Sequence, residues 1–235
     1  LNSNLLILQS KHWVNNSNFN KFNDFFSCEN EADILGEFFF LISNFLASEE
    51  NYEKSNFYSN ISNYLNPKFY FNLTMLVENY YMIDDFEKSK SILNNFQKDD
   101  QIYQWYKIKK IAQIISIQKN DNLSIKYIED NFKKISKPDS KMFYDLANLY
   151  RQFKMYNKSI DNYNLILDRF QLDDLSKASI LYRRGTSYER LGNYSASDKD
   201  LLNSLKLNYD EAYVLNYLAY NWLERNHKIV DAIDM

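Results

Sequence analysis

The chain has 235 residues, of which 45% are hydrophobic and 17% aromatic, and its formal net charge is −3. This composition can bury a sizeable core, which excludes disorder, and the small negative charge gives no field that would collect nucleic acid or anionic lipid. Only three glycines and two prolines occur, far fewer than β-sandwiches and barrels need for their turns. We therefore expect a soluble all-α protein with no nucleic-acid partner.

The first 35 residues are expected to form a helical segment, too irregular to align with the rest of the chain. The most apolar stretch, 34–47, has roughly half the length that a bilayer requires and contains Glu37, which predicts a buried helix without direct membrane insertion. Cys28 is the single cysteine, so an intrachain disulfide is excluded. Because the chain begins with Leu1, we expect a piece of a longer protein, and the localisation stays open between cytoplasm and periplasm.

From residue 36 onward, a short pattern with a serine in a fixed place recurs. Consecutive serines of this pattern are 34 to 38 residues apart, and recurrence at such a period is typical of helical-repeat proteins. Placing each serine at position 20 of a repeat starts the repeats at residues 36, 70, 105, 140 and 178, with a truncated sixth near 212. The serines are Ser55, Ser89, Ser124, Ser159 and Ser197.

The first half of each repeat carries one apolar stripe. Positions 4 and 11 are apolar or aromatic in every repeat, and position 8 is small or compact, a spacing that puts all three on one face of a helix. Position 7 is also apolar, with Arg184 as the exception. Positions 4, 8 and 11 hold Phe39, Ser43 and Leu46; Leu73, Val77 and Tyr80; Ile108, Ala112 and Ile115; Phe143, Ala147 and Tyr150; Leu181, Gly185 and Tyr188; and Leu215, Ala219 and Trp222.

A polar break follows this helix A, and a second apolar stripe then predicts a helix B in each repeat. Asn and Asp in the breaks can cap helix B, and Pro67 at position 32 ends the first one. The expected inner faces of helix B are Tyr58 and Ile61; Ser89, Leu93 and Phe96; Ile125, Ile128 and Phe132; Ile160, Tyr163 and Ile166; and Leu201, Ser204 and Leu205.

This pattern resembles the tetratricopeptide repeat (TPR), a helix–turn–helix unit of about 34 residues. Two departures are Ser at position 20, where the family favours Ala, and Asp121 in place of the aromatic residue before helix B. The segment 215–223 is also similar to one in long TPR proteins of alphaproteobacteria. The resemblance implies a right-handed α-solenoid of antiparallel helix pairs over residues 36–235. It is best in the repeat 177–210, with Leu181, Gly185, Tyr188, Gly192, Tyr194, Ser197 and Leu201 in family positions.

In the family, positions 2, 5, 9 and 12 of helix A face a concave groove that binds a peptide or helix of a partner. Tyrosine recurs there; it offers a flat apolar face and a hydroxyl group, although a tyrosine-rich composition could also fill solvent-facing positions. The candidates are Tyr106, Lys109 and Gln113; Lys141, Tyr144, Asn148 and Arg151; Tyr182, Thr186 and Glu189; and Tyr213, Asn216 and Tyr220. The same positions elsewhere hold Phe71, Thr74, Glu78, Tyr81, Ser116 and Ser179.

The chain lacks the residues for the C-terminal carboxylate clamp of some family members. The nearest parallel, Lys109 and Gln113 with Arg183, has Asp145 and Ser179 at the intervening places, so we reject that clamp.

No catalytic or metal-binding motif occurs in the sequence. The two histidines, His12 and His227, lie at opposite ends, and there is no Gly-rich phosphate loop or Cys-x-x-Cys. We therefore expect a non-catalytic scaffold without cofactors that binds a protein or peptide partner. The alternatives are a self-association or docking module of a larger assembly, such as one at an envelope, and the regulatory arm of a larger enzyme.

The sixth repeat ends midway through its helix B. Because each repeat buries its apolar face against its neighbours, we expect uncapped repeat ends that could support self-association. Leu215, Leu218 and Trp222 should then be poorly covered.

Overall fold

The computed structural model describes residue 10 and residues 13–14, 17–20, 22, 30–96, 100–209 and 211–234. The elements in these residues are α-helices, and no strand occurs among them. The chain divides into two compact units, residues 1–135 and 136–235, and each unit is described by itself. The helical segment expected over residues 1–35 lies largely outside the described residues.

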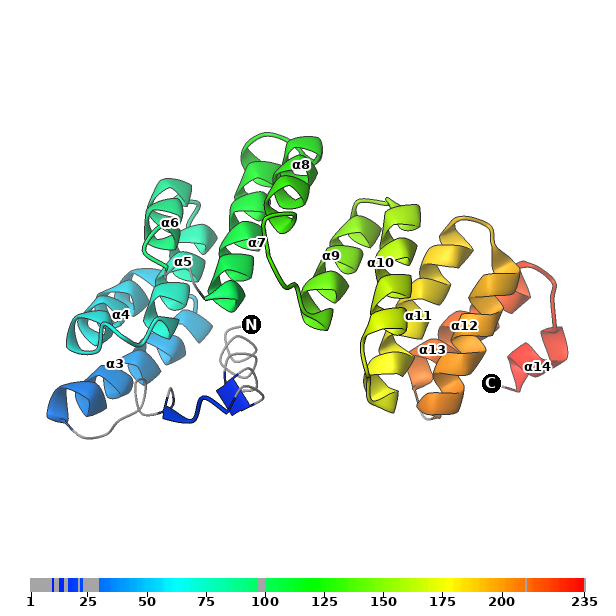
Figure 1. The fold of residues 1–235 in the computed structure, drawn as a ribbon, viewed down its shortest axis with the longest axis horizontal. Coiled ribbons are helices and arrows are strands. Elements are labelled where there is room, and N and C mark those ends of the chain that lie inside the picture. The colour runs from blue at the N-terminus through cyan, green and yellow to red at the C-terminus, as the bar shows by residue number, and fades with distance from the viewer. Residues whose placement is uncertain are drawn as a thin grey trace. The chain divides into compact units, whose positions relative to one another are not determined.

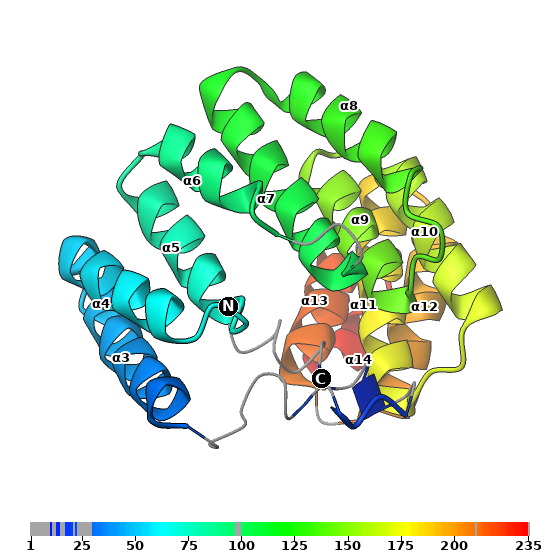
Figure 2. The ribbon, with the colours of Figure 1, turned by 60° about the vertical axis from the view of Figure 1, so that its left-hand side comes forward.

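The N-terminal unit consists of paired helices. Each helix packs along the next one in the chain, and the pairs α3–α4, α5–α6 and α7–α8 remain side by side in both views (Figures 1 and 2). The helices are α3 (Glu31–Ser48), α4 (Tyr52–Leu65), α5 (Phe71–Met82), α6 (Phe86–Leu93), α7 (Gln101–Gln118) and α8 (Asp121–Phe132).

The C-terminal unit continues the same alternation of long helices and short connections. The predicted fold class, an all-α repeat of helix pairs, is therefore confirmed. Its helices are α9 (Ser140–Gln152), α10 (Tyr156–Arg169), α11 (Asp174–Arg190), α12 (Tyr194–Leu207), α13 (Ala212–Glu224) and α14 (Ile229–Ile233). Among the described residues, no helix combines the length and the apolar composition needed to cross a membrane.

Four of the polar breaks between helices A and B share one turn geometry, and the break of the third repeat differs, because φ of Lys119 is −131°. The residue before the N-cap has a positive φ, 57° at Glu50, 59° at Asp84, 59° at Lys154 and 75° at Gly192, which lets the chain reverse after helix A. Side chains then cap most of the following helices: Asn51 accepts a hydrogen bond from the backbone N–H of Lys54, Asp85 from that of Lys88, and Asn193 from that of Ala196.

The repeated serine at position 20 has a structural role in the first three repeats. Its hydroxyl group donates a hydrogen bond across the helix pair to the backbone oxygen of position 8. Because the hydroxyl is then satisfied, a buried serine can stand where the family favours alanine. The bonds join Ser55 to Ser43 (2.8 Å), Ser89 to Val77 (3.2 Å) and Ser124 to Ala112 (2.7 Å).

Ser89→Ala should therefore lower the free energy of unfolding by no more than about 1 kcal/mol, because it removes one hydrogen bond and keeps the small side chain. Ser89→Leu should cost more, about 1–3 kcal/mol, because Ser89 is completely buried between α5 and α6. Urea unfolding followed by circular dichroism measures both. The exposed Ser91 on the same helix provides a matched Ser→Ala control; equal costs for Ser89→Ala and Ser89→Leu would contradict the prediction.

In the first helix pair, the most deeply buried residues of helix B are not the two that the sequence predicts. Tyr58 and Ile61 of α4 are only partly buried, and the residues completely buried against α3 are Ser55, Ser59 and Ser62. The Ser62 hydroxyl donates to the backbone oxygen of Gly36. The small side chains bring the two helices close together, and the partly buried Tyr58 stacks on Phe39 of α3 with 5.9 Å between ring centroids.

The C-terminal end is better covered than the truncated repeat implied. Leu218 is completely buried and Trp222 is 2% exposed, while Leu215 is partly buried. The reason is α14, whose Ala232 joins the same apolar cluster. Even a helix of five residues is therefore enough to cover the indole ring.

Candidate functional site

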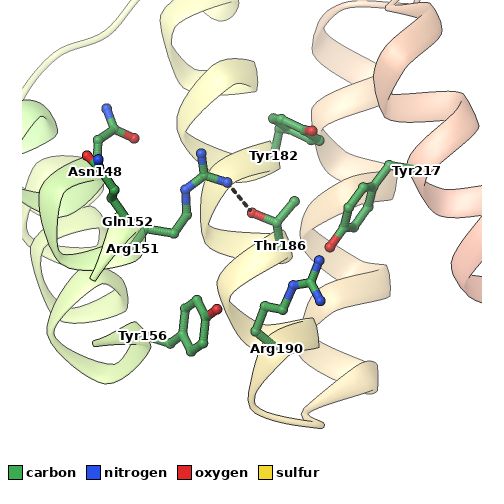
Figure 3. A pocket seen from close by; sticks show the side chains of 8 residues that line it. All are labelled: Asn148, Arg151, Gln152, Tyr156, Tyr182, Thr186, Arg190 and Tyr217. Carbon is green, nitrogen blue, oxygen red and sulfur yellow. Dashed lines mark hydrogen bonds between the residues drawn. The ribbon is translucent and has the colours of Figure 1, made fainter. Parts of the chain in front are cut away.

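A cavity of about 480 Å³ opens beside the A helices of the C-terminal unit (Figure 3). Three successive A helices, α9, α11 and α13, contribute to its wall, together with the first residue of α10. The lining residues are Asn148, Arg151, Gln152, Tyr156, Tyr182, Thr186, Arg190 and Tyr217.

Helical spacing explains why these side chains meet. On α9, Arg151 and Gln152 follow Asn148 by three and four residues. On α11, Tyr182, Thr186 and Arg190 follow one another at intervals of four residues. Residues so spaced share one helix face. Tyr182 and Tyr217 also pack against the apolar cluster that contains Leu218, so the wall of the cavity is continuous with the core of the unit.

Hydrogen bonds fix the α9 side of the cavity. Nη1 of Arg151 donates to Oγ1 of Thr186 at 3.2 Å, and that hydroxyl donates to the backbone oxygen of Arg183 at 2.8 Å. Oδ1 of Asn148 accepts from the Tyr163 hydroxyl at 2.7 Å. Burial raises the pKa of Tyr163 to about 12, although Arg151 and Arg183 act to lower it. Tyr163 therefore stays protonated and can hold Asn148 in place.

The α11–α13 side is held by Tyr217. Its hydroxyl donates to Oε2 of Glu189 at 2.8 Å, and the same oxygen lies 3.4 Å from Nε of Arg190. Burial and the bond to Glu189 both raise the pKa of Tyr217. The Tyr217 ring also meets Tyr182 edge to face, with 5.9 Å between ring centroids. These contacts make the wall a preorganised set of rings and hydroxyl groups.

Four of the predicted groove residues line this cavity: Asn148, Arg151, Tyr182 and Thr186. Others contact the wall or its neighbours: Glu189 holds Tyr217, Tyr213 packs on Tyr182 at 4.8 Å between centroids, and the Tyr144 hydroxyl lies 3.1 Å from that of Ser179. Lys141 pairs with Asp145, and Asn216 and Tyr220 are exposed outside the lining.

Sequence reasoning missed Gln152, Tyr156, Arg190 and Tyr217. Gln152 and Arg190 both stand at position 13 of their repeats, four residues after position 9, so the helical period could have added them to the set. Tyr156 is the first residue of helix B in its repeat, and Tyr217 stands at position 6 of a helix A. For these two residues the sequence gives no comparable signal.

Several groove positions of the N-terminal unit are engaged in packing. Tyr106 is only 8% exposed and belongs to the core beside Phe96, so its ring offers no surface to a ligand. Phe71 and Thr74 are buried as well. Lys109 lies over the Trp105 ring at 5.6 Å, while Gln113 is exposed.

Glu78 explains why Tyr106 turns inward. The carboxylate of Glu78 accepts hydrogen bonds of 2.7 Å from both the Tyr106 hydroxyl and Nζ of Lys110, and Lys110 also lies over the Tyr81 ring at 4.1 Å. The ion pair with Glu78 compensates the charge of Lys110, which is only 7% exposed. In the part of the chain that the structure describes, no group of His, Cys, Asp and Glu side chains could hold a metal ion.

Comparison with known proteins shows similarity of fold. No protein-family model and no curated protein matches the chain. Among solved structures, the APC/C heterotetramer Cut9–Hcn1 is similar over 81% of this chain, with a TM-score of 0.51 and 13% identity. The chain spans 37% of that protein's length. YrrB, a TPR protein with an unusual peptide-binding site, covers 75% of this chain and 88% of its own at 11% identity and a TM-score of 0.47. The first similarity supports a TPR-like fold.

Proposed function

We propose that the chain is a non-catalytic protein-interaction scaffold that binds a peptide or a helix of a partner in the cavity of the C-terminal unit. The observation that supports it most is the convergence of Asn148, Arg151, Tyr182 and Thr186 on one cavity. The register of the repeats, together with the resemblance to the TPR family, predicts these four residues as groove positions.

The chemistry of the lining suits a peptide. Amide and hydroxyl groups can hydrogen-bond an extended backbone, and tyrosine rings give contact area with little loss of side-chain freedom. The volume falls within the range of roughly 300–1,000 Å³ that ligand pockets occupy. The partners of Asn148, Thr186 and Tyr217 hold the wall in place before binding, which reduces the entropy lost on association.

A photo-crosslinking experiment tests this function. Benzoylphenylalanine is introduced at Gln152, which lines the cavity and is exposed, and the protein is irradiated in cells of the source organism. We expect a crosslinked partner at this position, identified by mass spectrometry of the adduct. Matched controls carry the same residue at Asp161 and Lys206, exposed positions on the B helices α10 and α12. Adducts at the control positions alone would reject the cavity as the binding site.

Self-association is the second candidate function. The α3 residues Phe38, Leu41 and Phe45 are each more than half exposed on one helix face, and Val230 and Ile233 of α14 are exposed at the other end of the sequence. Stacking of one end on the other in a second copy would be a head-to-tail contact, which can form rings or open chains.

Sedimentation over a range of concentrations tests this candidate. Self-association predicts masses above the 28.3 kDa of one chain that return to this value in a Leu41→Glu, Phe45→Glu variant. A constant mass of 28.3 kDa would reject it.

A further inference from the structure

We infer that the cavity of the C-terminal unit recognises an acidic group of the bound peptide, a carboxylate or a phosphate, between Arg151 and Arg190. This inference rests on the proposed function and specifies its ligand. Figure 3 shows the two guanidinium groups reaching the cavity from α9 and α11, on either side of Thr186.

The charge of the lining is positive. Arg151 and Arg190 are its two charged residues, and none of the eight lining side chains is acidic. The nearby carboxylate of Glu189 already accepts a hydrogen bond from Tyr217, and it lies on the Nε side of Arg190. One carboxylate against two guanidinium groups leaves an excess of positive charge, which an anion of the ligand would balance.

Arg151 keeps donors for such an anion. It is partly buried, and in the described part of the chain its side chain makes one hydrogen bond, to Thr186, and no ion pair. A guanidinium group has five N–H donors, so most of those of Arg151 remain open toward the cavity. Among the described residues, the hydroxyl groups of Tyr156 and Tyr182 also make no hydrogen bond, and each can donate to an anion oxygen.

The distribution of arginine supports a role that lysine cannot fill. The chain has 22 lysines and six arginines, and all six arginines lie between residues 151 and 225. Arg184 and Arg225 form ion pairs with Asp200 and Asp198. A chain that uses lysine for most of its positive charge thus places arginine at two positions of one cavity, where a planar fork can bind two oxygens of a carboxylate or phosphate.

This arrangement is different from the clamp that the sequence lacks. It uses positions 12 and 13 of two consecutive A helices, and it contains no lysine. The anion would lie beside aromatic rings, so the flanking peptide residues can pack on Tyr182 and Tyr217 while the acidic group reaches the guanidinium groups.

Nuclear magnetic resonance of the arginine Nε–Hε groups tests the inference, because six signals can be assigned from single Arg→Lys variants. N-acetylglutamate and sodium phosphate are titrated separately at constant ionic strength. We expect saturable shifts at Arg151 and Arg190, with Arg184 and Arg225, whose partners are carboxylates, as internal controls. Arg151→Gln should weaken binding of the effective probe by about tenfold or more, whereas Arg169→Gln, an exposed residue of α10, should leave it unchanged.

The outcomes distinguish the source of the anion. Saturation by N-acetylglutamate indicates a carboxylate of the peptide, on a side chain or at its C-terminus, and saturation by phosphate alone indicates a phosphorylated residue. Equal, unsaturable shifts at all arginines, or no shifts, would overturn the inference. Selection from a displayed peptide library separates this inference from the proposed function: peptides that bind the wild type without an acidic residue and tolerate Arg151→Gln leave the scaffold function intact and reject the anion site.

Discussion

Replacement of Arg184 by alanine should lower the free energy of unfolding by about 3–5 kcal/mol, because it leaves a buried carboxylate without its partner. Nε of Arg184 lies 2.6 Å from Oδ2 of Asp200, and Nη2 lies 2.8 Å from Oδ1, so the pair is bidentate. Asp200 is only 3% exposed, and Nη1 of Arg184 also donates to Oδ1 of Asn164 at 2.7 Å. Burial alone would lower the pKa of Arg184, but its bonds to Asp200 raise it.

Two controls test whether the loss of stability comes from the unpaired carboxylate of Asp200. Arg169→Ala removes an exposed arginine of α10 and should change stability by less than about 0.5 kcal/mol. The double variant Arg184→Met, Asp200→Leu removes both charges and should recover most of the loss. Urea unfolding gives the free energies, and hydrogen exchange should show faster opening of α11 and α12 with α3 to α6 unchanged, since repeat stability is local. An Arg184→Ala variant within about 1 kcal/mol of wild type would contradict the argument.

Arg184 also shows what a repeat pattern can and cannot predict. The register identified position 7 as apolar and Arg184 as its exception, but it did not indicate the compensating Asp200, which lies on the following helix. A pattern of single positions describes one helix face at a time, whereas a buried ion pair is a property of two faces. The prediction for the first helix pair was incomplete for the same reason: Tyr58 stacks on Phe39 of α3, but the completely buried residues of α4 include the serines that meet Gly36 and Ser43.

The sequence predicts a cavity-lining residue correctly where its position on the helix face alone determines its exposure. Asn148, Arg151, Tyr182 and Thr186 follow the register and line the cavity. Tyr106 has the same register and is buried, because Glu78 accepts its hydroxyl and Phe96 packs on its ring. Whether a tyrosine lies inside or outside depends on partners that the repeat period does not specify.

The C-terminal end depends on a contact that the sequence concealed. A helix of five residues has no periodicity to detect, yet α14 brings Ala232 against Trp222 and places Nζ of Lys228 4.6 Å from the centre of the indole ring. The expectation of an uncovered end was based on the incomplete helix B of the sixth repeat. The residues of α14 are enough to cover Trp222.

Trp222→Ala should therefore lower the free energy of unfolding by about 3–5 kcal/mol, because it removes a large buried ring and leaves a cavity among Leu201, Leu218 and Ala232. Trp222→Phe should cost less, roughly 1–2 kcal/mol. Within the described residues Nε1 of Trp222 is buried and makes no hydrogen bond, so phenylalanine loses ring volume but no polar contact. Tyr220→Ala, an exposed residue of the same helix, should change stability by less than about 0.5 kcal/mol.

Hydrogen exchange would locate the effect of Trp222→Ala. The backbone N–H of Ala232 donates to the oxygen of Lys228, and that of Asp234 donates to the oxygen of Val230. Because α14 is far shorter than an isolated helix needs to be stable in water, these bonds depend on docking to the indole ring. In Trp222→Ala, the amides of residues 232 and 234 should lose their protection before those of α13. If they exchanged at wild-type rates, α14 would be held by another contact, and Trp222 would contribute only to the core of the repeat.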